Sequence, residues 1–150
     1  RALMRPKSRP SSAWCEAAVK SIVLIARVLI GLFGIALLVL GILFWTGHAL
    51  SLVSVHAMVL GPLFVISLWL IAVLGFLTPG SRAFALLVLV WSLIVPAVGV
   101  TQLSLLPGSS HWVIQVIHLL VGLIAMALGH SLARRLGRRP AAAAAAPGAA

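Results

Sequence analysis

Five histidines carry most of the chemical scope of this sequence, and all lie within or beside long apolar runs: His48, His56, His111, His118 and His130. Imidazole binds metals, exchanges protons near neutral pH and forms hydrogen bonds. An ionisable side chain inside a membrane is costly without a partner, so its presence there favours a functional role. The first question is which of these imidazoles can act together.

His56 and His118 form the deeper of two expected pairs. His56 follows the start of the second apolar run, Ala49, by seven residues, and His118 follows the start of the fourth, His111, by the same number. At about 1.5 Å of helix rise per residue, both imidazoles lie about 10 Å below the outer surface. We expect them to face each other across a bundle, with His48 and His111 forming a shallower pair at the interface.

Three kinds of partner suit the deeper pair. The rings can hydrogen-bond to each other, to Gln115 or to Ser54; they can be the axial ligands of a haem b; or they can bind a non-haem metal ion. Two histidines are too few for a closed non-haem site, and Glu16, the only acid, and Cys15, the only thiol, lie outside the apolar runs. Haem needs only two imidazoles, so it is favoured over a metal ion, while plain hydrogen bonding stays open.

Two stripes of small and polar residues show which helix faces point inward. In the fourth run the spacing 4, 3, 4, 3, 4 places six residues on one face: His111, Gln115, His118, Gly122, Ala125 and Gly129. The first run repeats the pattern with Arg27, Gly31, Gly34, Leu38, Gly41 and Trp45. Small residues let helices approach closely or leave room for something flat. Gly122, one turn below His118, removes a side chain where a porphyrin needs space, and Gln115 shares that face.

The elements that must position these residues are four apolar runs at 20–45, 49–77, 83–106 and 111–132. The 63% content of hydrophobic residues and the mean hydropathy of +1.23 exclude an ordinary soluble domain. Each run exceeds the roughly 20 residues that a helix needs to cross a bilayer. The short connections TGH, TPGSR and LPGSS contain helix breakers and force antiparallel neighbours. The predicted fold is an all-α, antiparallel up-and-down four-helix transmembrane bundle.

Basic residues set the expected orientation. The formal charge of +10 comes from eleven Lys and Arg residues and one acid. The first and third loops contain no Lys or Arg. By the positive-inside rule both termini and the second loop are cytoplasmic, in a multi-pass protein of the inner (plasma) membrane. We divide the chain into a basic segment 1–19, a membrane domain 20–133 and a basic, then Ala/Pro-rich tail 134–150. This topology explains the charge without nucleic acid, and anionic-lipid attraction would be its side effect.

Arg27 lies about two turns inside the cytoplasmic end of the first run. Its long side chain can snorkel to the surface, or it can pair with an acidic group of a ligand. Pro96 in the third run removes a backbone donor and is expected to kink that helix, with Ser92 and Gly99 on the same face. We interpret that face as structural.

The segments HAMVLGPLFVISLWLIAV (56–73) and HWVIQVIHLLVGLIAMALGH (111–130) resemble small, uncharacterised four-span bacterial membrane proteins. More loosely, the chain is similar to four-helix b-type cytochromes, in which histidines of two helices clamp haem across the bundle. This similarity covers the second and fourth runs and depends mainly on His56 and His118. It implies one haem b, because His130 has no histidine at its depth on the second run.

Two functions from different classes follow. The first is electron transfer through one bis-histidine haem near the outer face, fed by a quinol, with His48 and His111 accepting protons or only anchoring the interface. Bis-imidazole ligation leaves no open coordination position, so oxygen chemistry is not expected. The alternative is a non-catalytic accessory subunit of a larger membrane complex. A transporter is less favoured, and no hydrolase or nucleotide-binding motif is present in the sequence.

Overall fold

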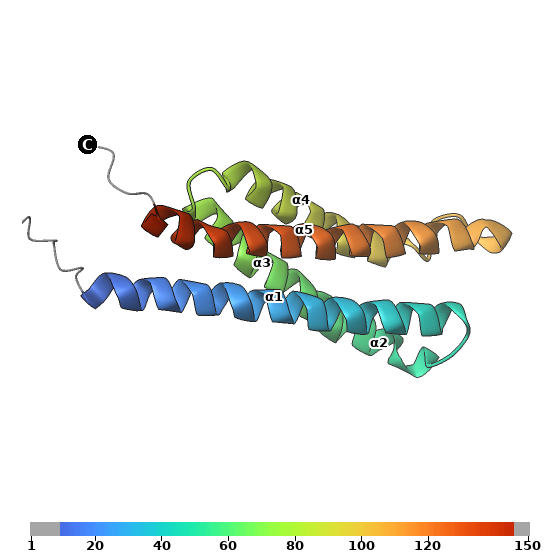
Figure 1. Ribbon diagram of the computed structural model, residues 1–150. Helices are drawn as coiled ribbons and strands as arrows, with labels where there is room; N and C mark the ends of the chain where they lie inside the picture. Colours follow the sequence, from blue (N-terminus) through green and yellow to red (C-terminus); the bar gives the residue numbers. More distant parts are fainter. Residues whose placement is uncertain (1–9, 146–150) are drawn as a thin grey trace, which may run out of the picture.

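The computed structural model describes residues 10–145 and confirms the all-helical four-span bundle (Figure 1). Its four candidate membrane spans are Glu16–Trp45, Leu50–Leu77, Arg82–Thr101 and Gly108–Arg138. Helix α1 (Pro10–Trp45) contains the first span. The second comprises a short 3-10 turn, η1 (Leu50–Leu52), α2 (Val53–Val55), a π-helical turn, η2 (His56–Leu60), and α3 (Gly61–Leu77). The third is α4 (Arg82–Thr101), and the fourth is the 3-10 turn η3 (Gly108–Ser110) followed by α5 (His111–Ala145).

The helices pack in a diamond rather than a square. Helix α1 packs against α3 and α5, and α4 packs against the same two helices. In addition, α3 contacts α5 directly across the centre. The second and fourth spans therefore form the short diagonal of the bundle, which is the helix order that lets a residue of one span face a residue of the other.

The tightly packed core lies toward one end of the bundle. This basic end is where α1 begins, where α3 connects to α4, and where α5 ends (Figure 1). Its buried apolar cluster contains residues of all four spans: Val23, Ala26, Ile30, Phe64, Leu68, Ile71, Ala72, Ala85, Val88, Ala125, Leu132, Ala133 and Leu136. Toward the opposite end, where α1 ends and α5 begins, Ile114 is the buried apolar residue among those described. The histidine pair thus belongs to the loosely packed half.

Two tryptophans tie the spans together inside this apolar framework. The indole N–H of Trp69 donates to Ser92 Oγ at 2.9 Å, linking α3 to α4. The indole N–H of Trp91 donates to the Val121 carbonyl at 2.9 Å, linking α4 to α5. Both bonds satisfy a polar atom that lipid cannot.

Several helix ends differ from the limits of the apolar runs. Helix α4 ends at Thr101 rather than at 106. Residues 102–106 form turns and a bend, and Leu106 adopts φ 47° just before Pro107. Helix α5 continues to Ala145, beyond the predicted 132, and α1 already begins at Pro10. Alanine and arginine are strong helix formers, so the helices extend past the apolar segments that mark the membrane. Residues 1–9 and 146–150, which hold the first nine residues of the predicted basic segment and the end of the tail, lie outside the described residues.

Candidate functional site

The structure brings His56 of the second span and His118 of the fourth together near the end of the bundle opposite the basic end. Their ring centroids are 6.5 Å apart and the ring planes are inclined by 52°. Both side chains are partly buried, and the Nδ1 atom of each is buried without a hydrogen-bond partner. The pairing that was expected from equal depth is therefore present.

A π-helical turn presents His56. The carbonyl of His56 accepts its hydrogen bond from the Gly61 N–H, five residues later, instead of from residue 60. Pro62 follows at once and has no N–H to continue the ordinary α-helical pattern. A Cβ at Gly61 would approach the His56 carbonyl to 3.2 Å, so glycine keeps this turn open. Such π-turns are frequent at functional sites because they re-aim a side chain.

The first span also contacts this histidine. Phe44 of α1 packs edge-on against the His56 ring, with centroids 5.4 Å apart and planes at 68°. The edge of an aromatic ring is electropositive and its face electronegative, so this T-shaped geometry is a favourable one. Phe44 therefore fixes the ring of His56 from the side of α1. The apolar pattern of the first run gave no signal for this role.

The third span supports the other histidine. A Cβ added to Gly99 of α4 would lie 3.1 Å from the Cε1 atom of His118. The imidazole thus packs closely against the backbone of α4 at this glycine. In the sequence, Gly99 shares a face with Ser92 and Pro96, and that pattern indicates a structural role. Its contact with His118 was missed, although a glycine on an inward face was the available signal.

Two pairs of glycines show that the bundle opens around the histidines. Near the core, an added Cβ at Gly34 of α1 would lie 2.7 Å from Met126 Sδ, and one at Gly129 of α5 would lie 2.6 Å from a methyl carbon of Leu68. One heptad farther from the basic end on the same stripes, Gly41 and Gly122 have nothing within 4 Å of that position. The space between α1 and α5 therefore widens from the core toward the level of the histidine pair.

The remaining predicted residues have lesser parts in this arrangement. Gln115 is partly buried and Ser54 is exposed, and no hydrogen bond joins either of them to the two rings within residues 10–145. His48 is exposed and shares a 3.1 Å hydrogen bond with Thr46 Oγ1. His111 lies at the start of α5, with Nδ1 3.4 Å from the Leu105 carbonyl. In the described chain no ring contact joins the shallower pair.

His130 lies away from the pair, toward the basic end. Its Nε2 is 3.5 Å from the position of a Cβ at Gly31, so it packs at the contact between α5 and α1. Among the described residues no group of three His, Cys, Asp or Glu side chains is placed to hold a metal ion. The ligand set that the site offers from these residue types is therefore the two imidazoles of His56 and His118.

Comparison of the sequence with protein-family models gave no match. Neither the curated proteins nor the solved structures gave a significant match. The resemblance to four-helix b-type cytochromes therefore stays a prediction, and the functional argument depends on the geometry of the histidine pair.

Proposed function

We propose that the protein binds one haem b between its second and fourth spans, with His56 and His118 as the axial ligands, and serves in membrane electron transfer. The observation that carries this proposal is the 6.5 Å separation of the two ring centroids. A metal–imidazole bond is about 2.0–2.1 Å long, which places the metal about 3 Å from a ring centroid. Two imidazoles on opposite sides of one iron are therefore about 6–6.5 Å apart, as these two are.

The unpartnered ring nitrogens support the same ligand set. The Nδ1 atoms of both histidines are buried without a hydrogen bond, and a buried polar atom without a partner costs about 1–3 kcal/mol. Neither Gln115 nor Ser54 offsets that cost in the described structure. Each ring can turn about its own axis so that one of its nitrogens coordinates the haem iron, which gives both imidazoles a partner. Haem ligation therefore explains the pair better than internal hydrogen bonding does.

The open space beside the pair suits a flat group. Gly41 and Gly122 leave the facing stripes of α1 and α5 without side chains at this level. When bound between two imidazoles, haem supplies one-electron transfer without an open coordination position. The contribution of the chain is to hold the two rings on opposite faces, to exclude water and to fix the depth in the membrane.

For the partners and the orientation we propose the following. Both termini face the cytoplasm in a bacterial inner membrane, so the histidine pair lies near the outer face. A quinol in the same membrane is the electron donor, and a second redox protein accepts the electrons. His48 and His111, at the outer ends of the spans, are the groups that we assign to take up the protons released by the quinol.

A reduced-minus-oxidised visible spectrum of the detergent-purified protein tests the haem. The wild type is expected to show a low-spin b-type spectrum with one haem per chain. His56→Ala and His118→Ala should each abolish that spectrum. His130→Ala removes a partly buried histidine of α5 that does not belong to the pair, and it should leave the spectrum unchanged.

Two outcomes would contradict the proposal. A helical, monodisperse wild-type protein that stays colourless when it is produced with an ample haem supply would remove the cytochrome function and favour the accessory subunit of a larger complex. A spectrum that survives in both alanine variants would place haem elsewhere in the chain.

A further inference from the structure

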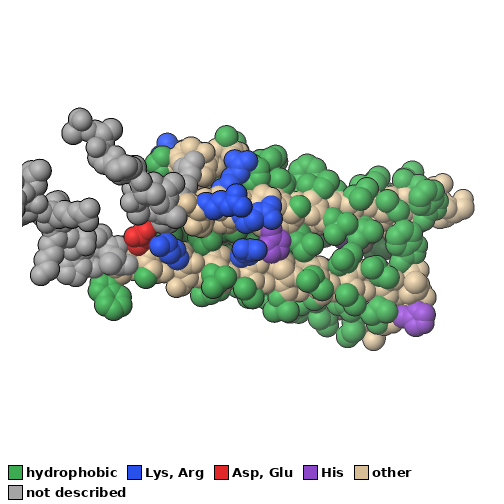
Figure 2. Space-filling view, viewed as in Figure 1, with side chains coloured by type: hydrophobic (Ala, Val, Ile, Leu, Met, Phe, Trp, Pro, Cys, Tyr) green, Lys and Arg blue, Asp and Glu red, His purple; other side chains and the backbone are tan. Residues whose placement is uncertain are grey.

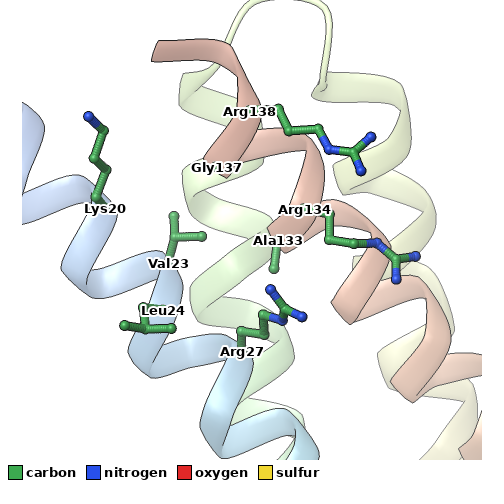
Figure 3. Close-up of a pocket in the computed structure, with 8 residues that line it drawn as sticks. All are labelled: Lys20, Val23, Leu24, Arg27, Ala133, Arg134, Gly137 and Arg138. Carbon is green, nitrogen blue, oxygen red and sulfur yellow. The ribbon is translucent and has the colours of Figure 1, made fainter. Parts of the chain in front are cut away.

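A second site lies at the basic end of the bundle, between α1 and α5. A cavity of about 440 Å³ separates the two helices there. Lys20 and Arg27 of α1 and Arg134 and Arg138 of α5 line it. In Figure 3, Arg27 extends from α1 toward α5, and Arg134 and Arg138 extend side by side from α5. The cavity is thus bounded by four cations from two helices that are far apart in the sequence.

The charge of this cavity is not balanced by the described part of the chain. The one acidic residue, Glu16, pairs with Lys20 on the same helix at 3.5 Å, and both side chains are about half exposed, at 51% and 55%. Arg134 donates a hydrogen bond to Ser131 Oγ at 3.0 Å, which leaves its charge uncompensated. For Arg27 and Arg138 no ion pair is formed among residues 10–145. Like charges around one cavity repel, and a bound anion relieves that repulsion.

Basic residues outside the cavity are held differently. Arg82 donates to the Phe76 carbonyl at 3.2 Å. The guanidinium of Arg135, next to Arg134 in the sequence, stacks over the Phe84 ring at 4.2 Å from its centroid. These two arginines have partners within the chain, whereas Arg27 and Arg138 of the cavity form no ion pair among residues 10–145. Figure 2 shows the resulting gathering of Lys and Arg side chains over α1 and α5 on one face of the bundle.

The position of the cavity selects a lipid over a soluble anion. Its lining residues lie at the basic ends of the candidate membrane spans Glu16–Trp45 and Gly108–Arg138. Leu24, on the same wall, is 60% exposed, and such an apolar side chain offers a surface to acyl chains rather than to water. Gly137 also lines the cavity and contributes no side chain to it. The space around its Cβ position is open, with nothing within 4 Å. A ligand with a phosphate and adjoining acyl chains matches both parts of this lining.

We propose that the cavity binds the phosphodiester headgroup of an anionic phospholipid, with Arg27 and Arg134 as the principal phosphate ligands. Basic pockets between membrane helices on the cytoplasmic side are suited to such headgroups. The site is separate from the histidine pair. Arg27 and Phe44 are 17 residues apart on α1, which is about 25 Å along the helix axis, so the cations cannot serve a group held by His56.

Native mass spectrometry of the detergent-purified protein tests this site. The probes are phosphatidylglycerol, phosphatidylcholine with the same acyl chains, and inorganic phosphate. The wild type should retain phosphatidylglycerol in preference to phosphatidylcholine. The variant Arg27→Gln/Arg134→Gln should lower the affinity for phosphatidylglycerol by about 25-fold, at about fivefold for each basic residue near a phosphate.

Two further variants separate local binding from net charge and from misfolding. Arg82→Gln/Arg135→Gln removes the same charge outside the cavity and should keep wild-type binding. Arg27→Lys/Arg134→Lys keeps the charge and should retain most of the affinity, provided that circular dichroism shows unchanged helicity in every variant. Equal losses in the two glutamine variants, or no loss in either, would overturn the proposal. Binding of inorganic phosphate that displaces phosphatidylglycerol would assign the cavity to a soluble anion and overturn the lipid.

Discussion

His118 packs against the backbone of α4 at Gly99, where an added Cβ would lie 3.1 Å from the imidazole Cε1. On its other side the ring faces His56 at a centroid distance of 6.5 Å. The orientation of His118 therefore depends on a residue of a third helix that supplies no ligand of its own. Gly99 is a positioning residue, and its effect on the pair can be separated from its effect on the fold.

Gly99→Leu should displace the His118 ring and lower the haem content nearly as far as His118→Ala does. Gly99→Ala, which needs a shift of only a few tenths of an ångström, should have a smaller effect. The haem-to-protein ratio and the visible spectrum measure both. Val100→Leu is the matched control, since Val100 is the next residue and is 80% exposed. Equal haem content in Gly99→Leu and Val100→Leu would show that the contact does not position the ring.

Pro62→Ala should convert the π-turn before it to ordinary α-helix. The N–H of the alanine that replaces Pro62 can donate the ordinary α-helical hydrogen bond to the Met58 carbonyl. The missing N–H of Pro62, which favours the wider turn at His56–Leu60, is then no longer present. Removing one residue from a turn rotates the preceding segment by about 100° relative to α3. His56 would leave His118, so the low-spin spectrum should be lost while the helicity seen by circular dichroism is kept. A wild-type spectrum in Pro62→Ala would mean that the π-turn does not aim His56.

Glycines of the bundle should respond to the same change in opposite ways. At Gly75 an added Cβ would lie 2.8 Å from Ala85 Cβ, which cannot move without its backbone. Gly75→Ala should therefore destabilise the protein by about 1–3 kcal/mol through overpacking. Gly122→Ala meets open space and should be neutral or stabilising by up to about 1 kcal/mol, because alanine favours helix. The midpoint of thermal unfolding in detergent, followed by circular dichroism, measures both.

The space beside the pair can be filled deliberately. Gly41→Leu/Gly122→Leu should leave a folded, helical protein, because both positions are open, but should exclude a flat group and lower the haem content. Full haem content in this variant would contradict the placement of haem between α1 and α5, whereas unfolding would contradict the openness of the gap.

The pairing of His56 with His118 was predictable because the polar loops mark where each span begins. His56 and His118 each follow such a boundary by seven residues, and helix rise converts equal counts into equal depth. The antiparallel bundle was predictable for the same reason, since span length and loop length depend on composition. Equal depth alone did not establish contact. That required α3 and α5 to lie on the short diagonal, which depends on side-chain packing among all four helices.

The supports of the pair were beyond the sequence pattern. The π-turn depends on a single hydrogen bond, from the Gly61 N–H to the His56 carbonyl, just before Pro62. Hydrophobic periodicity does not indicate such a bond. Phe44 and Gly99 act on the histidines through contacts between helices, so the periodicity of a single span gives neither. The ends of the helices were also not predicted by the apolar runs. The apolar run of the fourth span stops at 132 while α5 continues to Ala145, because apolarity reports the membrane and helix propensity reports the helix.

Trp91→Phe should destabilise the bundle by about 1 kcal/mol. The substitution keeps the aromatic packing but removes the indole donor that bonds to the Val121 carbonyl at 2.9 Å across α4 and α5. Hydrogen bonds between membrane helices contribute about 0.6–2 kcal/mol. The Val121 carbonyl lies inside α5 and keeps its helical partner, so the loss should stay at the low end. Thermal unfolding of wild type and variant in one detergent gives the difference, and a loss above about 3 kcal/mol would indicate that the indole packing was not preserved.

Cys15, the one thiol in the chain, tests the orientation on which the outer placement of the histidine pair depends. With cytoplasmic termini, a membrane-impermeant maleimide should label it in inside-out vesicles and not in intact spheroplasts. The variant Cys15→Ser/Ser109→Cys moves the thiol to the exposed loop before α5 and should give the reverse pattern. Labelling of Cys15 from outside the cell would invert the topology. It would place the haem near the cytoplasmic face and the cationic cavity in the outer leaflet, while leaving the geometry of both sites unchanged.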